Sequence, residues 1–369
     1  MKKVFVALSG GVDSSVAAYL LIKQGYDVTG VFMKNWTRPI DAHGRMYCPW
    51  QEDLASARAA AAHLGIPLKI YNFELDYHDN VVEYFFATYE TGATPNPDAM
   101  CNRTIKFGAF LKRARQEGAD YIATGHYART ARIKNSKIKR QNEYQLLRGV
   151  DPNKDQSYFL WAVRPDVLRH CLFPIGGLRK TEVRAIAKKV GLPNAMRKDS
   201  QGICFIGPIR VNQFLKERIK EKQGMVKTVQ GEVVGEHQGV HFVTIGQRRG
   251  TGVATGQPMY VVAKRVDVNE VIIDEDWPGS PLYSEGAEVG ELNIFEEHSN
   301  GVYNVQVRYR QKPVAATIDR IGLDRMRVLF KEPVRAVTEG QSLVWYDGDT
   351  LAGGGEIIKR ITTHGFTTQ

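Results

Sequence analysis

The chain has 369 residues, of which 43% are apolar and 24% charged; these values exclude wholesale disorder, and at ~150 residues a domain the length favours two or three domains. The formal net charge of +10 is unevenly spread, because residues 103–208 hold 22 lysines and arginines against 8 aspartates and glutamates. A segment this basic is typical of proteins that bind a polyanion, most often a nucleic acid, with a solvated basic surface as the alternative.

The first part of the chain alternates between strand-like and helix-like patterns, which is typical of a parallel sheet with helical crossovers. The patterns predict, in chain order, a strand at 3–8, a helix at 14–24, a strand at 28–33, a helix at 52–64, a strand at 68–73, helices at 77–89 and 104–116, and a strand at 121–124. Ligands of parallel sheets bind beyond the carboxyl ends of the strands. Functional groups are therefore expected after Leu8, Met33 and Thr124.

The basic middle segment predicts a surface hairpin followed by helices. Arg129–Arg140 holds six lysines and arginines and no acid, and it precedes a strand-like run at 144–147. Helices are expected at 156–162, 165–171 and 181–190.

After residue 222 short alternating runs separated by Gly, Pro and Asp predict an all-β remainder, a barrel or a sandwich. Strands are expected at 232–234, 240–245, 259–266, 271–274, 302–310, 315–320, 326–330 and 355–360. The Trp-Pro-Gly-Ser-Pro run at 277–281 is the best boundary within this part. We therefore predict an α/β domain at 1–208, a small and mostly β central linker domain at 209–281 and a C-terminal β domain at 282–369.

No run of about 18 apolar residues occurs, and the N-terminus lacks the apolar core of a signal sequence, so we expect a cytoplasmic protein without a membrane anchor. The cysteines Cys48, Cys101, Cys171 and Cys204 form no CxxC pair and lack zinc-site spacing, so neither structural zinc nor a disulfide framework is predicted. Cys101 precedes a helix expected to open near Thr104, and a helix N-terminus lowers a thiol pKa. Cys204 follows polar and basic residues. Both are candidate reactive thiols, with burial as a small apolar residue the alternative, whereas Cys171 is predicted to pack.

The strongest local motif is Ser-Gly-Gly-Val-Asp-Ser-Ser at 9–15, between a buried strand and the first turn of a helix. Adjacent glycines let the backbone approach an anion, and serine hydroxyls and helix N-terminal amides donate to it, so phosphate binding is predicted. The lysine of a GxxxxGK[ST] loop is not part of this motif. Asp13 beside phosphates favours a Mg²⁺ ion between them. A plain glycine-rich turn is the alternative.

This loop resembles the pyrophosphatase loop of the N-type ATP pyrophosphatase superfamily, whose members adenylate a substrate. Further motifs resemble the tRNA-specific 2-thiouridylases in sequence and order, and they extend essentially from end to end of the chain. These motifs are TPNPDAMCN at 94–102, IKFG at 105–108, ATGHY at 123–127, KDQSYFL at 154–160, DSQGICFI at 199–206, TIGQRRG at 244–250 and RYR at 308–310. The resemblance implies an adenine nucleotide alpha hydrolase-like N-terminal domain that is catalytic, and a C-terminal β-barrel.

The resemblance also implies ATP-dependent 2-thiolation of the wobble uridine of tRNA, in which the 2-carbonyl oxygen is adenylated and then replaced by sulfur from a cysteine persulfide. Cys204 is implied as the persulfide carrier, Cys101 as its partner in a transient disulfide, and Asp98 as the group that transfers a proton or holds the uracil. An Asx-type turn cap is the alternative for Asp98. Whether free hydrosulfide or the persulfide attacks the base stays open. Implied cofactors are ATP and Mg²⁺, and implied partners are the tRNA anticodon stem-loop, with Lys, Glu and Gln acceptors, and a sulfur carrier or cysteine desulfurase.

Two sets of contact residues follow from the resemblance. ATP contacts are implied for Ala7, Leu8, Ser9, Gly10, Gly11, Val12, Asp13, Ser14, Met33 and Gly125. Contacts with tRNA or its target base are implied for Asn96, Pro97, Asp98, His126, Lys154, Asp155, Gln156, Arg308, Tyr309 and Gln341. The residues alone leave alternatives open: a satisfied structural histidine at His126, a helix cap at Asp155, and opposite strand faces for Arg308 and Tyr309 unless a bulge or edge intervenes.

Two competing functions also remain open. One is another adenylating synthetase, such as an amidotransferase-type enzyme, which has no use for Cys101 and Cys204 together. The other is an RNA-binding protein that senses ATP without catalysis. No metal site made by the protein alone is predicted.

Overall fold

The computed structural model of the protein describes residues 1–37, 49–133, 143–199, 211–253, 256–295 and 301–362. The chain forms two compact units. Unit 1 comprises residues 1–82, 97–208 and 349–351, and unit 2 comprises 83–96, 209–348 and 352–369. The three-domain division at 208 and 281 stays a prediction. No helix of the described residues is long and apolar enough to cross a membrane.

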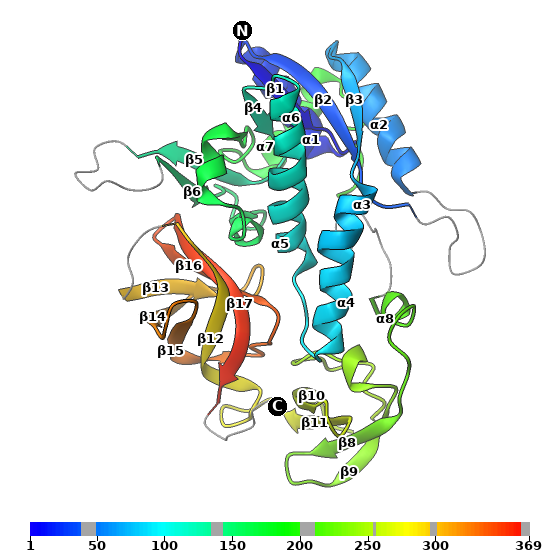
Figure 1. Cartoon of the computed structure of the whole chain (residues 1–369), viewed down its shortest axis with the longest axis vertical. Coiled ribbons are helices and arrows are strands. Elements are labelled where there is room, and N and C mark those ends of the chain that lie inside the picture. The colour runs from blue at the N-terminus through cyan, green and yellow to red at the C-terminus, as the bar shows by residue number, and fades with distance from the viewer. Residues whose placement is uncertain (38–48, 134–142, 200–210, 254–255, 296–300, 363–369) are drawn as a thin grey trace. The chain divides into compact units, whose positions relative to one another are not determined.

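Unit 1 is built around a parallel five-stranded sheet in the order β3-β2-β1-β4-β7. Its strands are β1 (Lys3–Ala7), β2 (Asp27–Lys34), β3 (Leu68–Asn72), β4 (Tyr121–Ala123) and β7 (Cys171–Leu172). An antiparallel hairpin outside this five-stranded sheet consists of β5 (Ala128–Arg132) and β6 (Tyr144–Arg148). Its helices are α1 (Val12–Lys23), α2 (Pro49–Leu64), α3 (Glu74–Tyr77), η1 (His78–Val82), α5 (Pro97–Cys101), η2 (Asn102–Ala109), α6 (Phe110–Gln116), η3 (Ser157–Leu160), η4 (Pro165–His170) and α7 (Lys180–Val190). The predicted βαβαβ order and the hairpin are confirmed (Figure 1).

Helix α1 lies at the centre of this unit because it is apolar on two sides. Ala18 and Leu21 pack against Val4 and Val6 of the sheet. On its other side Val16 belongs to a buried cluster that also contains residues of α7. The loop at the start of α1 is therefore held between the sheet and α7, which places residues of both around it.

Unit 2 is mostly β. Strands β8 (Gly224–Thr228), β9 (Val233–His237), β10 (Met259–Arg265) and β11 (Glu270–Glu275) form a four-stranded sheet. Strands β12 (Tyr283–Ile294), β13 (Gly301–Gln306), β14 (Val314–Arg320), β15 (Met326–Arg335), β16 (Ser342–Asp347) and β17 (Thr350–Ile361) form a barrel, which the pairing of β12 with β17 closes. Short helices are α4 (Glu83–Glu90), α8 (Val211–Leu215) and η5 (Val240–Phe242). The predicted order of an α/β domain, a small β domain and a C-terminal barrel is confirmed.

Several predicted elements were wrong in kind or extent. The run 240–245 forms no strand: Val240–Phe242 form the 3₁₀ turn η5, and Val240, Val243 and Ile245 are buried in the central β core. The helices expected at 156–162 and 165–171 are the short 3₁₀ turns η3 and η4. The helix expected from Thr104 begins at Pro97, a residue preorganised for the first helical position, and runs on through α5, η2 and α6. Strands β7, β8, β12 and β16 were not predicted.

Candidate functional site

The loop between β1 and α1 has the geometry of an anion site. Gly10 adopts a φ of +80°, and Gly11 precedes the first helical residue with a φ of −78° and a ψ of 160°. The Ser14 hydroxyl donates to the Gly11 carbonyl at 3.1 Å and lies 3.3 Å from the Ser9 hydroxyl. A twelve-residue helix begins here, and the partial positive charge at its N-terminus favours an anion such as phosphate.

Side chains from segments distant in the sequence form hydrogen bonds with this loop. The Asn194 amide nitrogen donates to the Gly10 carbonyl at 2.8 Å and to the Ser15 hydroxyl at 2.9 Å, and Ser56 donates to the same carbonyl at 2.7 Å. Arg197 also contacts this carbonyl at 3.2 Å. These side chains occupy the Gly10 carbonyl and fix the conformation of the loop, so the loop is preorganised for a ligand at its free amides.

Other predicted nucleotide contacts fit this loop through the backbone. The side chains of Ala7, Leu8, Val12 and Met33 are buried, so only their backbone groups are suited to contact a nucleotide. A Cβ atom at Gly125 would lie 2.7 Å from the Ser14 nitrogen, so only glycine lets the end of β4 come this close to the loop.

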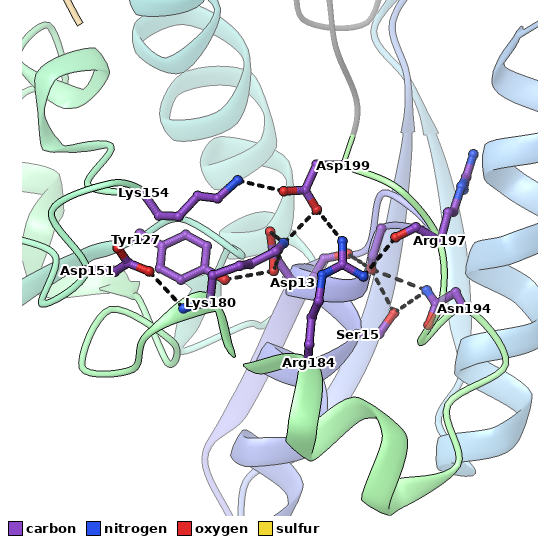
Figure 2. Close-up of polar contacts among 12 residues, drawn as sticks. Asp13, Ser15, Tyr127, Asp151, Lys154, Lys180, Arg184, Asn194, Arg197 and Asp199 are labelled. Carbon is purple, nitrogen blue, oxygen red and sulfur yellow. Dashed lines mark hydrogen bonds and ion pairs between the residues drawn. The ribbon is translucent and has the colours of Figure 1, made fainter. Parts of the chain in front are cut away.

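A network of ion pairs adjoins the loop at Asp13 (Figure 2). The Lys180 ammonium lies 2.7 and 2.8 Å from the two carboxylate oxygens of Asp13, and the Tyr127 hydroxyl donates to one of them at 2.9 Å. Burial and the neighbouring Asp13 carboxylate raise the pKa of Tyr127, so this hydroxyl remains a proton donor. Lys180 is the first residue of α7, whose N-terminus is capped by Asp151, which accepts from the Lys180 amide at 2.9 Å.

Three cations converge on Asp199, as Figure 2 shows. Lys154 lies 2.6 Å from one carboxylate oxygen, and Lys180 and Arg184 each lie 2.8 Å from the other. Burial by itself raises the pKa of Asp199, but hydrogen bonds from Lys154 and Lys180 outweigh it and lower the pKa to about 2. Asp199 is therefore ionised at neutral pH and links Lys180 at the loop to Lys154 of the KDQ motif.

The structure places Asp98 and Cys101 one turn apart on α5, and therefore on one face of that helix. Asp98 is half-buried and Cys101 is fully buried. Because the helix begins at Pro97, Cys101 lies within it, and the prediction that Cys101 precedes the start of this helix was wrong. Cys204 and Cys48 fall outside the described residues, so the disulfide of Cys101 with Cys204 stays a prediction.

Cys171 packs as predicted. It is 2% exposed, its thiol donates to the Val167 carbonyl at 3.2 Å, and burial raises its pKa. A thiol in this state is a poor nucleophile, because the thiolate is the reactive form.

Two of the predicted RNA contacts in unit 1 have the surroundings of structural residues. His126 is buried, its Nδ1 lies 2.8 Å from the Thr124 hydroxyl, and burial holds its pKa well below 6.5. Asp155 is buried and accepts from Arg148 and from both the amide and the hydroxyl of Ser157, which begins η3. The N-cap residue of η3 is Gln156, and Asp155, one residue earlier, accepts from the first amide of this turn.

The other two residues of the KDQ motif are less enclosed. The Lys154 side chain is 29% exposed. Gln156 accepts from the Tyr127 amide at 3.1 Å through its side chain. Lys154 is therefore the KDQ residue best suited to an RNA phosphate.

The predicted RNA contacts of unit 2 lie in turns. Strand β13 ends at Gln306, so Arg308 and Tyr309 follow a finished strand, and the objection that they point to opposite faces does not apply. Arg308 donates to the Ile245 carbonyl and the Thr338 hydroxyl, both at 3.0 Å.

Family models match the chain in three consecutive parts. They are described as tRNA methyl transferase HUP domain over residues 2–208, tRNA methyl transferase PRC-barrel domain over 212–275 and aminomethyltransferase beta-barrel domain over 287–357. A tRNA-specific 2-thiouridylase MnmA of Pseudomonas savastanoi pv. phaseolicola is 47% identical over 365 residues, which cover 97% of this chain and 94% of that protein. The protein of the same name from Escherichia coli O1:K1 is 46% identical over 369 residues, with 98% of each chain covered. The chain belongs to the tRNA-specific 2-thiouridylase family.

Among solved structures, one described as a 4-thiouridine synthetase in complex with RNA and bound ATP has a TM-score of 0.34 and 19% identity. The match covers 58% of this chain and 50% of that one. At this TM-score and identity, nothing about the function of the present chain follows from the match.

In this member of the thiouridylase family, sequence reasoning missed the residues that surround the loop. They are Ser56, Tyr127, Asp151, Lys180, Arg184, Asn194, Arg197 and Asp199. The loop motif contains no lysine. Lys180, which lies 167 residues after Asp13 in the chain, supplies an ammonium group at the Asp13 carboxylate. A motif search confined to the loop has no signal for it, although Asp199 begins the DSQGICFI motif.

Replacing Gly10 by alanine is expected to weaken ATP binding through the loop. Gly10 and Gly25 both have a φ of +80°, but a Cβ at Gly10 would collide with the Asp53 carbonyl, whereas Gly25 has nothing within 4 Å. Both variants should lose about 1–2 kcal/mol of unfolding free energy through backbone strain. Only Gly10→Ala should raise the KM for ATP, by about tenfold or more, because the loop must shift. Equal KM values for the two variants in a pyrophosphate-release assay would contradict this.

Proposed function

We propose that this protein is an ATP-dependent tRNA-uridine 2-sulfurtransferase that converts the wobble uridine to 2-thiouridine and releases AMP and pyrophosphate. The observation that carries this proposal is the identity of 46–47%, over nearly the full length, to proteins named tRNA-specific 2-thiouridylase. The anion-binding geometry of residues 9–15 supports the nucleotide step.

In the first step the 2-carbonyl oxygen of the uridine attacks the α-phosphorus of ATP, and pyrophosphate leaves. The amides and hydroxyls of the loop are suited to the triphosphate. Lys180 is placed to neutralise charge on the departing pyrophosphate. Asp13 is the residue suited to hold Mg²⁺ together with the phosphates, where the ion would neutralise further charge. The described residues offer no cluster of three or more His, Cys, Asp or Glu side chains for a metal, so a Mg²⁺ ion at Asp13 would be held together with phosphate oxygens and water.

In the second step sulfur replaces the activated oxygen. The terminal sulfur of a Cys204 persulfide attacks C2 and AMP leaves, after which the Cys101 thiolate attacks the Cys204 sulfur and releases the thiocarbonyl. Alternatively, Cys101 first frees hydrosulfide, which then attacks C2. Both routes end with a Cys101–Cys204 disulfide, which a thiol reductant must open, and a sulfur carrier or cysteine desulfurase must then restore the persulfide. Asp98, one turn before Cys101, is the proposed proton donor or acceptor.

The RNA partner we propose is a tRNA anticodon stem-loop with a wobble uridine, of the Lys, Glu or Gln acceptors. An anticodon loop presents an unpaired base, which lowers the cost of exposing its 2-carbonyl. Residues 103–208 hold 22 basic and 8 acidic residues, and this positive net charge favours contacts with RNA phosphates. Asn96, Pro97 and Asp98 are the proposed contacts to the target base. Because its proposed substrate is tRNA, we propose a cytoplasmic location.

The test is the product formed from unmodified tRNA with ATP, Mg²⁺ and a persulfide donor. We expect 2-thiouridine by nucleoside mass spectrometry, together with pyrophosphate release that requires tRNA. The description of the matching family models names methyl transfer, and a methylated nucleoside would favour that function instead. Absence of any 2-thiouridine contradicts the proposal, whereas RNA binding without pyrophosphate release would indicate a non-catalytic protein.

A further inference from the structure

Unit 2 contains a polar pocket in the segment that follows η5. The pocket has a volume of about 280 Å³, and the residues that line it include Arg248, Arg249, Thr251 and Gln257. Both arginines are exposed. Within the part of unit 2 that the structure describes, neither guanidinium group forms a hydrogen bond or an ion pair. A pocket lined by two unpaired cations suits an anionic ligand.

Contacts within the segment fix the backbone that carries the two arginines. The Gln247 side-chain oxygen accepts from the Thr244 amide at 3.0 Å, and its side-chain nitrogen donates to the Arg249 carbonyl at 2.8 Å. These two bonds close a turn over residues 244–249. Little backbone freedom is therefore left to lose when a ligand binds, which favours affinity.

The segment is anchored to the barrel beside a residue for which an RNA contact is predicted. Arg308 donates to the Ile245 carbonyl at 3.0 Å. Gly246 has a φ of +84°, and a Cβ at this position would lie 2.6 Å from the Ala336 Cβ, so only glycine permits this approach. Ala336 directly follows β15 of the barrel. The segment that carries the two arginines thus adjoins Arg308 within unit 2.

The positive charge of this segment is local. Residues 209–369 hold 20 lysines and arginines against 21 aspartates and glutamates, so this part of the chain has no basic excess. Residues 237–264, by contrast, contain Arg248, Arg249 and Lys264 and no aspartate or glutamate. Lys264 is buried, and its ammonium donates to the Val243 carbonyl at 3.0 Å. Three cations therefore lie in one segment without a carboxylate of its own.

We propose that Arg248 and Arg249 bind backbone phosphates of the RNA substrate at this pocket. The proposal rests on the proposed function, in which that RNA is a tRNA. A guanidinium group donates two parallel N–H bonds to a phosphate, and such contacts supply affinity and orientation without reading the sequence. Among the described residues that line the pocket, none is aromatic, so no ring is offered on which a base could stack. The backbone of the RNA is therefore the ligand that the pocket fits.

The double variant Arg248→Gln with Arg249→Gln tests the site, because it removes both charges and keeps polar side chains. We expect the Kd for unmodified tRNA to rise about tenfold or more at about 50 mM monovalent salt. The magnitude of the slope of log Kd against log salt concentration should fall by about 2, one for each lost phosphate contact. The rate of 2-thiouridine formation at saturating tRNA should stay within about twofold of the parent rate. An unchanged Kd and slope would overturn the proposal.

Arg320→Gln with Arg325→Gln is the matched control, since it removes the same charge from exposed residues of unit 2. These arginines flank the turn before β15, whereas the pocket segment contacts the residue after that strand. The control should leave both the Kd and the slope unchanged. Equal changes in the two double variants would show that net charge alone sets the affinity, and would exclude a site at Arg248 and Arg249.

Two further comparisons identify the ligand. Arg248→Lys with Arg249→Lys keeps the charges and should keep the salt slope of the parent, whereas a slope as low as that of the glutamine pair would contradict phosphate contacts. A raised KM for ATP with an unchanged Kd for tRNA would assign the pocket to a triphosphate instead of RNA. If the parent binds tRNA but forms no 2-thiouridine, the proposed function fails, and the Kd and the salt slope still decide whether this pocket binds RNA phosphates.

Discussion

Cys101→Ser is expected to lower 2-thiouridine formation by at least about 10³-fold while tRNA-dependent pyrophosphate release continues, because a serine hydroxyl cannot take part in sulfur exchange. In the proposed mechanism Cys101 acts after adenylation, so the nucleotide step should not require its thiol. Cys204→Ser should show the same separation of the two steps. Nucleoside mass spectrometry and a coupled pyrophosphate assay on one reaction measure both.

Cys171→Ser is the matched control for this experiment. Cys101 and Cys171 are both buried, at 0% and 2% exposure, so the same substitution places a hydroxyl in the protein interior in each case. The Cys171 variant should keep its thiolation rate, since serine can donate to the Val167 carbonyl as the thiol does. Equal losses in the two variants would indicate a packing effect, and retained thiolation in Cys101→Ser would exclude its proposed role.

Lys180→Met is expected to lower tRNA-dependent pyrophosphate release by about 100-fold, the usual effect of removing one charged donor from a site of charge development. The ammonium contacts both Asp13 and Asp199, and its side chain is only 11% exposed. Methionine keeps the length and removes the charge. The values of kcat and KM for ATP in the pyrophosphate assay measure the effect. Lys189→Met, an exposed lysine on the same helix, should leave both unchanged.

The same variant should be less stable in a pH-dependent way. Its partner Asp199 has a pKa lowered from 3.8 to about 2, so its ion pairs stabilise the fold fully above pH 4 and lose this effect as the pH falls toward 2. Urea unfolding should show a stability difference of about 1 kcal/mol between parent and variant at neutral pH, because Asp199 is 36% exposed and solvent screens its ion pairs. This stability difference should shrink as the pH falls from 4 toward 2. A difference that stays constant over this range would mean that Lys180 does not lower the pKa of Asp199.

The sequence by itself determined the features that depend on neighbouring residues. Hydrophobic periodicity predicted β1, α1, β2, α2 and β3, because each element buries one local pattern. The Ser9–Ser15 motif identified the anion loop, since two glycines, serines and a helix start lie within one turn. The ordered motifs identified the family that the full-length relatives confirm.

The tertiary structure alone decided which distant groups complete the site. Lys180, Asn194 and Arg197 reach the loop only because α7 and the segment after it pack over α1. No local pattern encodes a contact across more than 160 residues, such as the 167 between Asp13 and Lys180. Local patterns also failed in the apolar run 240–245, where Val240–Phe242 form a 3₁₀ turn and Val240, Val243 and Ile245 are buried in the central β core. Gln341 follows the same rule: the two backbone carbonyls that accept from its side-chain nitrogen lie 247 and 246 residues away in the chain.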